Sequence, residues 1–200
     1  MKRTAIFLLL ICTALAAPLP APQDWIRTGT GLGVEKVGLA VPECQLAFGS
    51  TANSDTLRKV FNDTLWNDLE SAGIFEMVSK SFYPLSQPAR PADVVLDAWG
   101  NPPASAGMLA FGNLGVSKDA LAVKGWLYDV KNSASPQVLG KQYSEAATPE
   151  NARLIAHRFA DEIIFRLGGG LPGIAESRIF FISNRSGHKE VWAMDYDGEG

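Results

Sequence analysis

Few residues in this sequence are of types and spacings that could do chemistry. There are two histidines, His157 and His188. A general base needs a nucleophile and an orienting acid that converge on it, and the sequence around the two histidines indicates neither. His157 lies one position off an apolar helical stripe, so capping or a hydrogen bond to a neighbouring loop explains it better. His188 lies in a predicted turn with Ser186, too close in sequence for a triad-like arrangement, and neither G-x-S-x-G nor H-E-x-x-H occurs.

Two segments resemble ligand-binding loops. The first, GTGLGV at residues 29–34, has Val34 in place of the last glycine of G-x-G-x-x-G, and no Lys-Ser or Lys-Thr pair follows it. The second, DYDGEG at residues 195–200, has carboxylates at alternate positions before a glycine, as a calcium loop does, but lacks the later bidentate glutamate. We interpret the first as a flexible turn and the second as an Asp-Gly turn between two strands.

The remaining candidates have simpler explanations. Asp161 and Glu162 are adjacent, so they point to different sides of a helix and do not form a catalytic pair. Cys44 has no histidine or basic partner nearby in the sequence, so a small buried apolar residue is favoured over a reactive thiol. We therefore expect no catalytic residue, no cofactor and no metal, and a protein that is not an enzyme.

Composition excludes one class of partner, and the first residues indicate export. The net charge is only −3, and the 18 Lys and Arg are scattered rather than clustered, which argues against nucleic-acid binding. Residues 1–16 have a positive start, an apolar stretch too short to span a bilayer, and Ala14-Leu15-Ala16 as a peptidase site. We expect cleavage after Ala16 and no membrane span afterwards; a lipid anchor on Cys12 is disfavoured by the bulky Ile11.

The elements after this signal alternate between strand and helix patterns. A Pro-rich, mobile segment at 17–31 precedes a short apolar strand at 36–44. An amphipathic helix starts at Ser54, capped by Ser54 or Asp55, and ends near Gly73. A second helix follows the cap Thr148, with Pro149 in its first position. Between the helices we expect strands at 74–78, 94–99, 108–114, 120–130 and 138–144.

The glycine- and proline-rich stretch GGGLPG at 168–173 predicts a domain boundary. Before it, residues 32–167 form an α+β domain, an α/β two-layer of two helices packed on a small mixed sheet. After a linker at 168–177, RIFFIS and EVWAMD bracket a turn and predict a hairpin at 178–200. An isolated hairpin is marginally stable, and this one resembles the first half of a β-propeller blade, so we expect the chain to be a truncated piece of a longer protein.

This order of parts resembles the TolB family, periplasmic proteins of the Tol–Pal envelope system. The more specific pieces are GLAVPE, LYDV followed by VLGKQY, RLIAHRFADEI, LPG and SRIFFIS. The second helix carries a core similar to the family's, with Ala156, His157, Arg158 and Asp161. The chain departs from the family at Cys44, where an aromatic residue is usual, in its Pro-rich leader, and in the missing propeller.

The resemblance implies a non-enzymatic periplasmic scaffold that binds envelope partner proteins, maintains outer-membrane integrity and supports constriction at cell division. It implies binding of a TolA-like inner-membrane protein through the mobile N-terminal segment, and of the peptidoglycan-associated lipoprotein through the propeller, mostly beyond residue 200. The candidate partner-binding residues are Asp24, Trp25, Ile26, Arg27 and Thr28. Trp25 and Ile26 would anchor an extended strand on a partner's sheet edge, or Trp25 would pin the N-terminus to its own domain.

An alternative function is the N-terminal part of an exported serine hydrolase or peptidase, in which a propeller precedes a catalytic domain. The two-helix domain before the propeller favours the scaffold. A third possibility is an independent small domain with a disordered hairpin tail.

Overall fold

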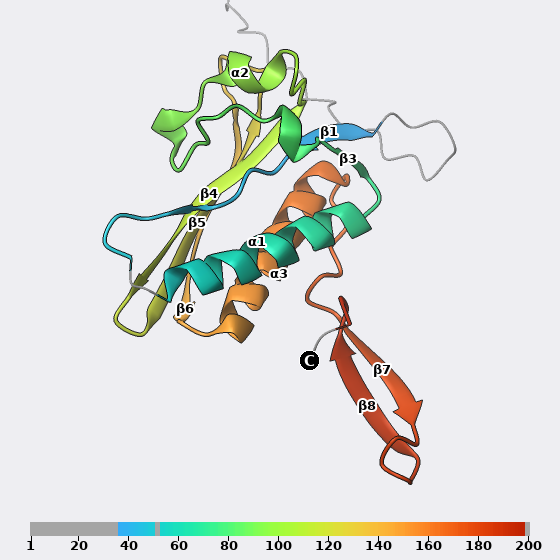
Figure 1. Ribbon diagram of the computed structural model, residues 1–200. Coiled ribbons are helices and arrows are strands. Elements are labelled where there is room, and N and C mark those ends of the chain that lie inside the picture. Colours follow the sequence, from blue (N-terminus) through green and yellow to red (C-terminus); the bar gives the residue numbers. More distant parts are fainter. Residues whose placement is uncertain (1–35, 51–52, 199–200) are drawn as a thin grey trace, which may run out of the picture.

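A six-stranded mixed sheet forms the centre of the molecule (Figure 1). The computed structural model describes residues 36–50 and 53–198. The expected signal at 1–16, the segment at 17–31 and the glycine loop at 29–34 lie outside the described residues. The strand order is β3-β1-β4-β5-β6, with β2 paired to β4. The strands are β1 (Val37–Ala40), β2 (Gln45–Leu46), β3 (Phe75–Met77), β4 (Met108–Ser117), β5 (Ala120–Asp129) and β6 (Gln137–Ala146).

The sheet combines two kinds of pairing. β1 runs parallel to both β3 and β4, with Leu39 opposite Met108. β4, β5 and β6 form an antiparallel meander, at the positions of the strands expected at 108–114, 120–130 and 138–144. Gly112 lies opposite Gly125 in this meander. The mixed sheet predicted from the sequence is therefore confirmed.

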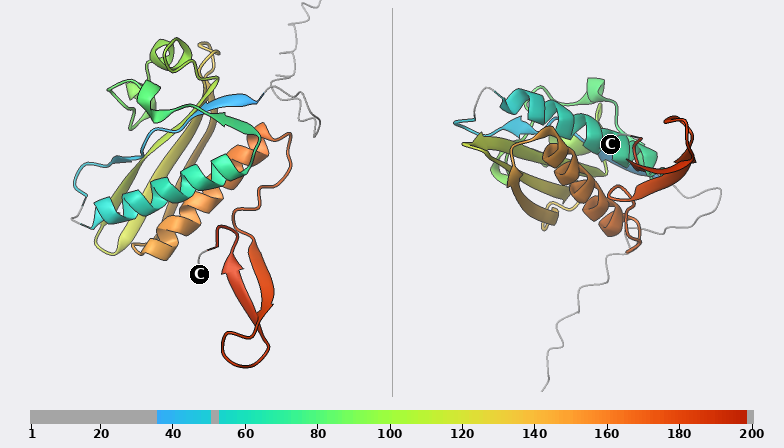
Figure 2. Two further views of the ribbon diagram at one scale, coloured as in Figure 1. Left: turned by 45° about the vertical axis from the view of Figure 1, so that its right-hand side comes forward. Right: turned by 90° about the horizontal axis from the view of Figure 1, so that it is seen from below.

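Two long helices, α1 (Ser54–Ser71) and α3 (Pro149–Leu167), cover one face of the sheet (Figures 1 and 2). The predicted stripe of α3 is buried, and Thr148 caps its start by accepting a hydrogen bond from the Asn151 amide at 3.2 Å. The predicted caps of α1 are wrong. The N-cap is Asn53, in helical conformation and without a side-chain cap bond, while Ser54 is buried in the first turn.

The prediction of a strand at 94–99 is also wrong, because α2 (Leu96–Gly100) is a short helix. It lies on the sheet face opposite the two long helices, next to two 3₁₀ turns (Lys80–Phe82 and Pro91–Asp93). The helical turn buries Trp99 in a second core with Phe111 and Tyr128, while Val95 stays 63 % exposed. In a strand, successive side chains point to opposite faces, so the apolar residues at 94–99 would be divided between two faces instead of being buried together.

The predicted hairpin is present as β7 (Arg178–Ser183) and β8 (Glu190–Asp195), and it projects away from the sheet and helices (Figure 2). Several of its large apolar side chains are exposed. Phe180, Ile182 and Val191 have 69 %, 73 % and 73 % of their surface accessible. The hairpin thus presents apolar surface that the described part of the chain does not cover.

Candidate functional site

One stretch of α3 contacts three other parts of the molecule. His157 reaches α1, Arg158 reaches the end of β6, and Arg158 and Asp161 both reach the segment that leads into the hairpin. These are residues of the Ala-His-Arg-x-x-Asp core noted in the sequence. We call this region the α3 junction, defined by Asp68, Arg153, His157, Arg158, Asp161 and Asp197.

His157 and Asp68 form a buried pair between the two long helices. The Nδ1 of His157 lies 2.7 Å from Oδ2 of Asp68, and the two side chains are 5 % and 2 % exposed. Burial alone would lower the pKa of His157, but the hydrogen bond and charge of Asp68, together with the charge of Asp197, outweigh burial and raise it. Burial also raises the pKa of Asp68, against the hydrogen bond from His157. The partner of His157 is therefore a carboxyl group of another helix and not the loop predicted from the sequence.

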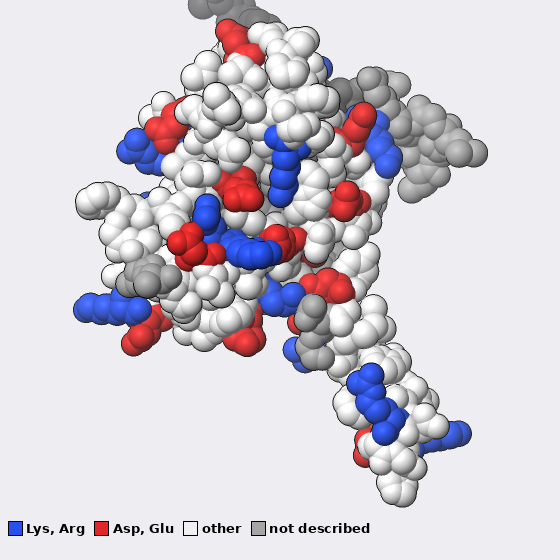
Figure 3. Space-filling view, viewed as in Figure 1, with Lys and Arg blue, Asp and Glu red and all other residues white. Residues whose placement is uncertain are grey.

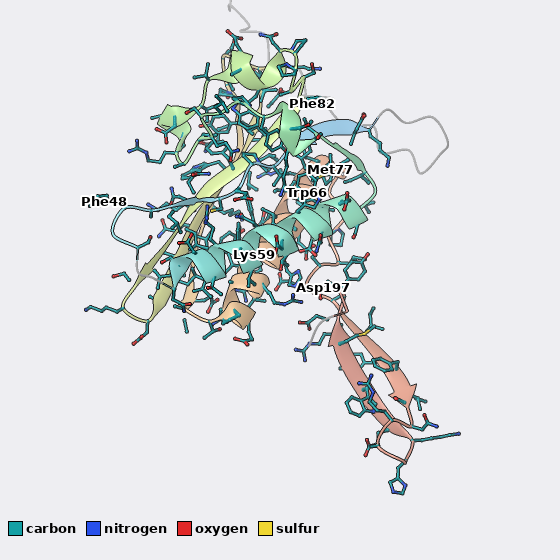
Figure 4. All side chains as sticks on the ribbon, viewed as in Figure 1. Phe48, Lys59, Trp66, Met77, Phe82 and Asp197 are labelled. Carbon is teal, nitrogen blue, oxygen red and sulfur yellow. The ribbon has the colours of Figure 1, made fainter. Side chains whose placement is uncertain are left out.

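Asp197 connects the end of the hairpin to α3. Its Oδ2 lies 2.5 Å from Nη2 of Arg153 and 3.8 Å from Nε2 of His157. Figure 4 shows Asp197 at the end of the hairpin nearest the helices. The Tyr196 amide donates to the carbonyl oxygen of Ser177 at 3.0 Å, which closes the base of the hairpin. Asp197 belongs to the segment that was considered as a calcium loop. Residues 195–198 of this segment form a turn, with the Gly198 amide donating to the Asp195 carbonyl oxygen, while the strand expected after the turn lies outside the described residues.

Asp161 and Arg158 hold the segment before the hairpin. The two carboxylate oxygens of Asp161 accept hydrogen bonds from the amides of Ala175, at 3.0 Å, and Glu176, at 3.3 Å. Arg158 lies between two carboxylates, 2.8 Å from Glu145 at the end of β6 and 3.4 Å from Glu176. Asp161 and its neighbour Glu162 act separately, as predicted, because Glu162 instead pairs with Lys141 of β6.

A cavity of about 610 Å³ lies between the first turns of α3 and the base of the hairpin. Its lining carries charges of both signs: Glu150, Arg153, Glu176, Arg178 and Asp195. The exposed face of the helices is similarly mixed, with acidic and basic side chains interspersed (Figure 3). Such a surface does not favour a ligand of a single charge sign.

The chain is similar along nearly its whole length to proteins of known family. The Tol-Pal system protein TolB of Desulfosudis oleivorans is 32 % identical over 202 residues, covering 98 % of this chain and 43 % of that protein. The Tol-Pal system protein TolB of Geobacter metallireducens is 29 % identical, covering 99 % of this chain and 44 % of that protein. The chain belongs to the TolB family. No family model matches it, and it spans less than half the length of the curated TolB relatives it matches.

The fold of this TolB-family chain is also that of a solved TolB structure. TolB from Acinetobacter baumannii aligns with a TM-score of 0.61 at 20 % sequence identity, covering 84 % of this chain and 38 % of that one. The two proteins therefore share their fold over the aligned part. None of the helices in the described part of the chain has the length and apolar character needed to cross a bilayer.

The described residues do not assemble a nucleophile beside either histidine. Nε2 of His157 has no hydrogen-bond partner among the described residues, and the Ser186 hydroxyl donates to Glu190 at 2.7 Å rather than to the ring of His188. Cys44 is buried, and burial raises the pKa of its thiol far above the usual range, so the predicted apolar role fits. Within residues 36–50 and 53–198, no group of three or more His, Cys, Asp or Glu side chains could hold a metal ion.

The residues predicted from the sequence to bind a partner, Asp24, Trp25, Ile26, Arg27 and Thr28, lie outside the described residues. The junction built around His157 and Asp68 was not predicted. The spacing of His157 and Asp161, one helical turn apart, could have indicated a shared face. No local pattern could have paired His157 with Asp68, because they are separated by 89 residues.

Proposed function

We propose that this chain is part of a non-enzymatic periplasmic scaffold of the Tol–Pal envelope system. The observation that supports it most is the similarity to TolB relatives over 98–99 % of the chain, including the two-layer domain and the hairpin. In this proposal the scaffold binds envelope proteins, and through them maintains outer-membrane integrity and supports constriction during division.

The domain division belongs to the same proposal. Residues 1–16 are the export signal, 17–31 a mobile segment, 32–167 the α/β domain, 168–177 the linker and 178–200 part of a first propeller blade. The uncovered apolar side chains of the hairpin, Phe180 and Ile182 among them, support the last assignment, since blades pack face to face around a propeller. Without a neighbouring blade packed against it, the apolar surface of the hairpin would stay exposed to water.

The proposed scaffold role implies two partner proteins. A TolA-like inner-membrane protein binds the segment at 17–31, with Trp25 and Ile26 as its apolar anchors. The peptidoglycan-associated lipoprotein binds the propeller, beyond most of the residues present in this chain. The α/β domain then serves as the base that carries the N-terminal segment and orients the propeller after the linker.

Calorimetry with the periplasmic part of the TolA-like protein tests the first partner. Deleting residues 17–31 should abolish binding while circular dichroism shows that the domain stays folded. Deleting residues 17–23 alone is the matched control, because it removes the Pro-rich leader and keeps residues 24–28. Unchanged affinity after the longer deletion would contradict the proposed site. No described feature favours the peptidase alternative.

A further inference from the structure

Asp197 lies just past the end of β8 and is held by two side chains from one face of α3. Arg153 and His157 are four residues apart, so they project from consecutive turns of the same helical face. Both approach the same oxygen of Asp197, Arg153 at 2.5 Å and His157 at 3.8 Å. The side chains of Asp197 and Arg153 are 16 % and 22 % exposed, so this contact is shielded from solvent.

The orientation of His157 is fixed from its other side. Because Nδ1 lies 2.7 Å from the carboxylate of Asp68, it carries the proton in the neutral ring and donates to Asp68. The neutral ring then presents the lone pair of Nε2 toward Asp197; Nε2 is a buried atom that has no hydrogen-bond partner in the described part of the chain. The imidazolium presents an N–H in the same direction. One proton therefore changes the contact with Asp197 from unfavourable to favourable.

We propose that Asp68, His157, Arg153 and Asp197 form a pH-dependent latch, in which protonated His157 holds the end of β8 against α3 and neutral His157 loosens it. Charged groups act on the His157 ring from each of the three elements that the latch connects. Asp68 comes from α1, Arg153 from α3 itself and Asp197 from the end of the hairpin, while Asp161 of α3 acts on Asp68. Glu150, Glu176, Arg178 and Asp195 line the cavity beside His157.

Among the charged groups that act on the ring of His157, two carboxylates oppose one cation. Asp68 and Asp197 favour the imidazolium over the neutral ring, against the effect of burial and of Arg153. The latch is therefore closed on the acid side and loosens as the pH rises past the ordinary range of histidine titration. Arg153 keeps its own contact with Asp197 throughout, so the end of β8 loosens rather than detaches.

The latch acts on only one of the two chain segments at the base of the hairpin. The segment entering β7 is held by Asp161 through the amides of Ala175 and Glu176, without His157. The segment leaving β8 contains Asp197 itself, and its Tyr196 amide donates across to Ser177. Loosening should thus appear at 193–198, the end of β8 and the residues after it, and leave the amides of Ala175 and Glu176 protected, which provides an internal reference.

Amide hydrogen exchange of the full chain, followed by mass spectrometry from about pH 5.5 to about pH 8.5, tests the latch. Protection factors at 193–198 should fall roughly fivefold as the pH rises, the size expected for loss of one partly shielded charge pair. His157→Asn keeps a donor toward Asp68 but cannot titrate, so it should show low protection at 193–198 at every pH. His188→Asn, which changes the other histidine in the exposed turn, should behave as the wild type.

Asp197→Asn provides a second, independent variant on the hairpin side of the contact. It leaves the buried pair of His157 and Asp68 intact, so the domain folds even if the substitution of His157 prevents folding. It should remove the pH dependence at 193–198 while the amides of Ala175 and Glu176 stay protected. The latch is refuted if the pH dependence persists in Asp197→Asn or in folded His157→Asn, or if it disappears in His188→Asn.

Discussion

Replacing Gly125 by alanine should weaken the contact that seats α3, and with it the junction, on the sheet. Gly125 lies in β5 directly beneath the buried ring of Phe159. A methyl group added to Gly125 would lie 2.6, 2.8 and 2.9 Å from three atoms of this ring. Carbon atoms pack best at about 3.5–4.0 Å, so the ring would have to retreat by about 1 Å. The close approach of helix and sheet therefore requires glycine at this position.

The cost depends on how little room Phe159 has. The ring is 2 % exposed and packs edge-on against Tyr143, with ring centroids 6.4 Å apart. Overpacking a well-filled core costs about 1–3 kcal/mol, whereas replacing glycine in a strand otherwise gains roughly 0.5–1 kcal/mol. We expect a net loss of about 1–2 kcal/mol, which corresponds to a fall of about 2–8 °C in Tm for a chain of this size.

Urea and thermal unfolding of four variants measure this effect. Gly38→Ala in β1 is the matched control, because its added methyl group would meet only ordinary contacts, the nearest at 3.6 Å. It should be neutral or slightly stabilising. Phe159→Leu makes room for the methyl group, so the double variant should be more stable than the sum of the single changes predicts, by about 1 kcal/mol. Equal stability of Gly125→Ala and Gly38→Ala, or strict additivity in the double variant, would refute the packing argument.

Three further predictions concern the junction and the core. Gly173→Ala should loosen the linker from α3, because the added methyl group would overlap a carboxylate oxygen of Asp161. Limited proteolysis should then cleave residues 168–177 faster than in the wild type. An unchanged cleavage rate would contradict this prediction. The free energy of unfolding should decrease as the pH rises above the ordinary histidine pKa of 6.5, because His157 binds its proton more tightly in the folded state. The stability that this proton contributes is fully present below pH 6.5 and is lost as the pH rises through the raised pKa of His157. In urea unfolding at a series of pH values, His157→Asn should therefore reduce the dependence of the unfolding free energy on pH. Cys44 should react with a thiol reagent only on unfolding, since its thiol is buried with a raised pKa; rapid labelling of the native chain would show that this part of the core opens.

Much of the fold could be predicted because its signals are local. The helix start at Thr148 and Pro149 and the strand expected at 120–130 each depend on residues within one element. The structure has both, as α3 (Pro149–Leu167) and β5 (Ala120–Asp129). The segment at 94–99 was predicted wrongly because β-branched Val94 and Val95 suggest a strand, while the deciding interaction is the burial of Trp99 against distant strands. Tertiary packing overrides strand propensity in such cases.

The junction could not be predicted for a similar reason. His157 and Asp161 lie on one helix, and the sequence placed them correctly in α3. Their partners come from α1 and from both sides of the hairpin base, and pairing them requires the fold itself. A buried histidine one position off an apolar stripe indicates only that some polar partner exists.

The position of β1 also determines the order in which the domain can be completed. β1 is the first described strand along the chain, yet it lies between β3 and β4, which are synthesised after it. Leu39 and Ala40, both fully buried in the finished sheet, have no strand to join on the β4 side until Met108 and Leu109 have been made. The β4–β6 meander consists of neighbouring segments and closes only short loops, so it should form faster than the pairing of β1 with β4. During synthesis β1 thus stays without its β4 partner until the middle of the chain has been made, and the core that it shares with α3 is completed later still.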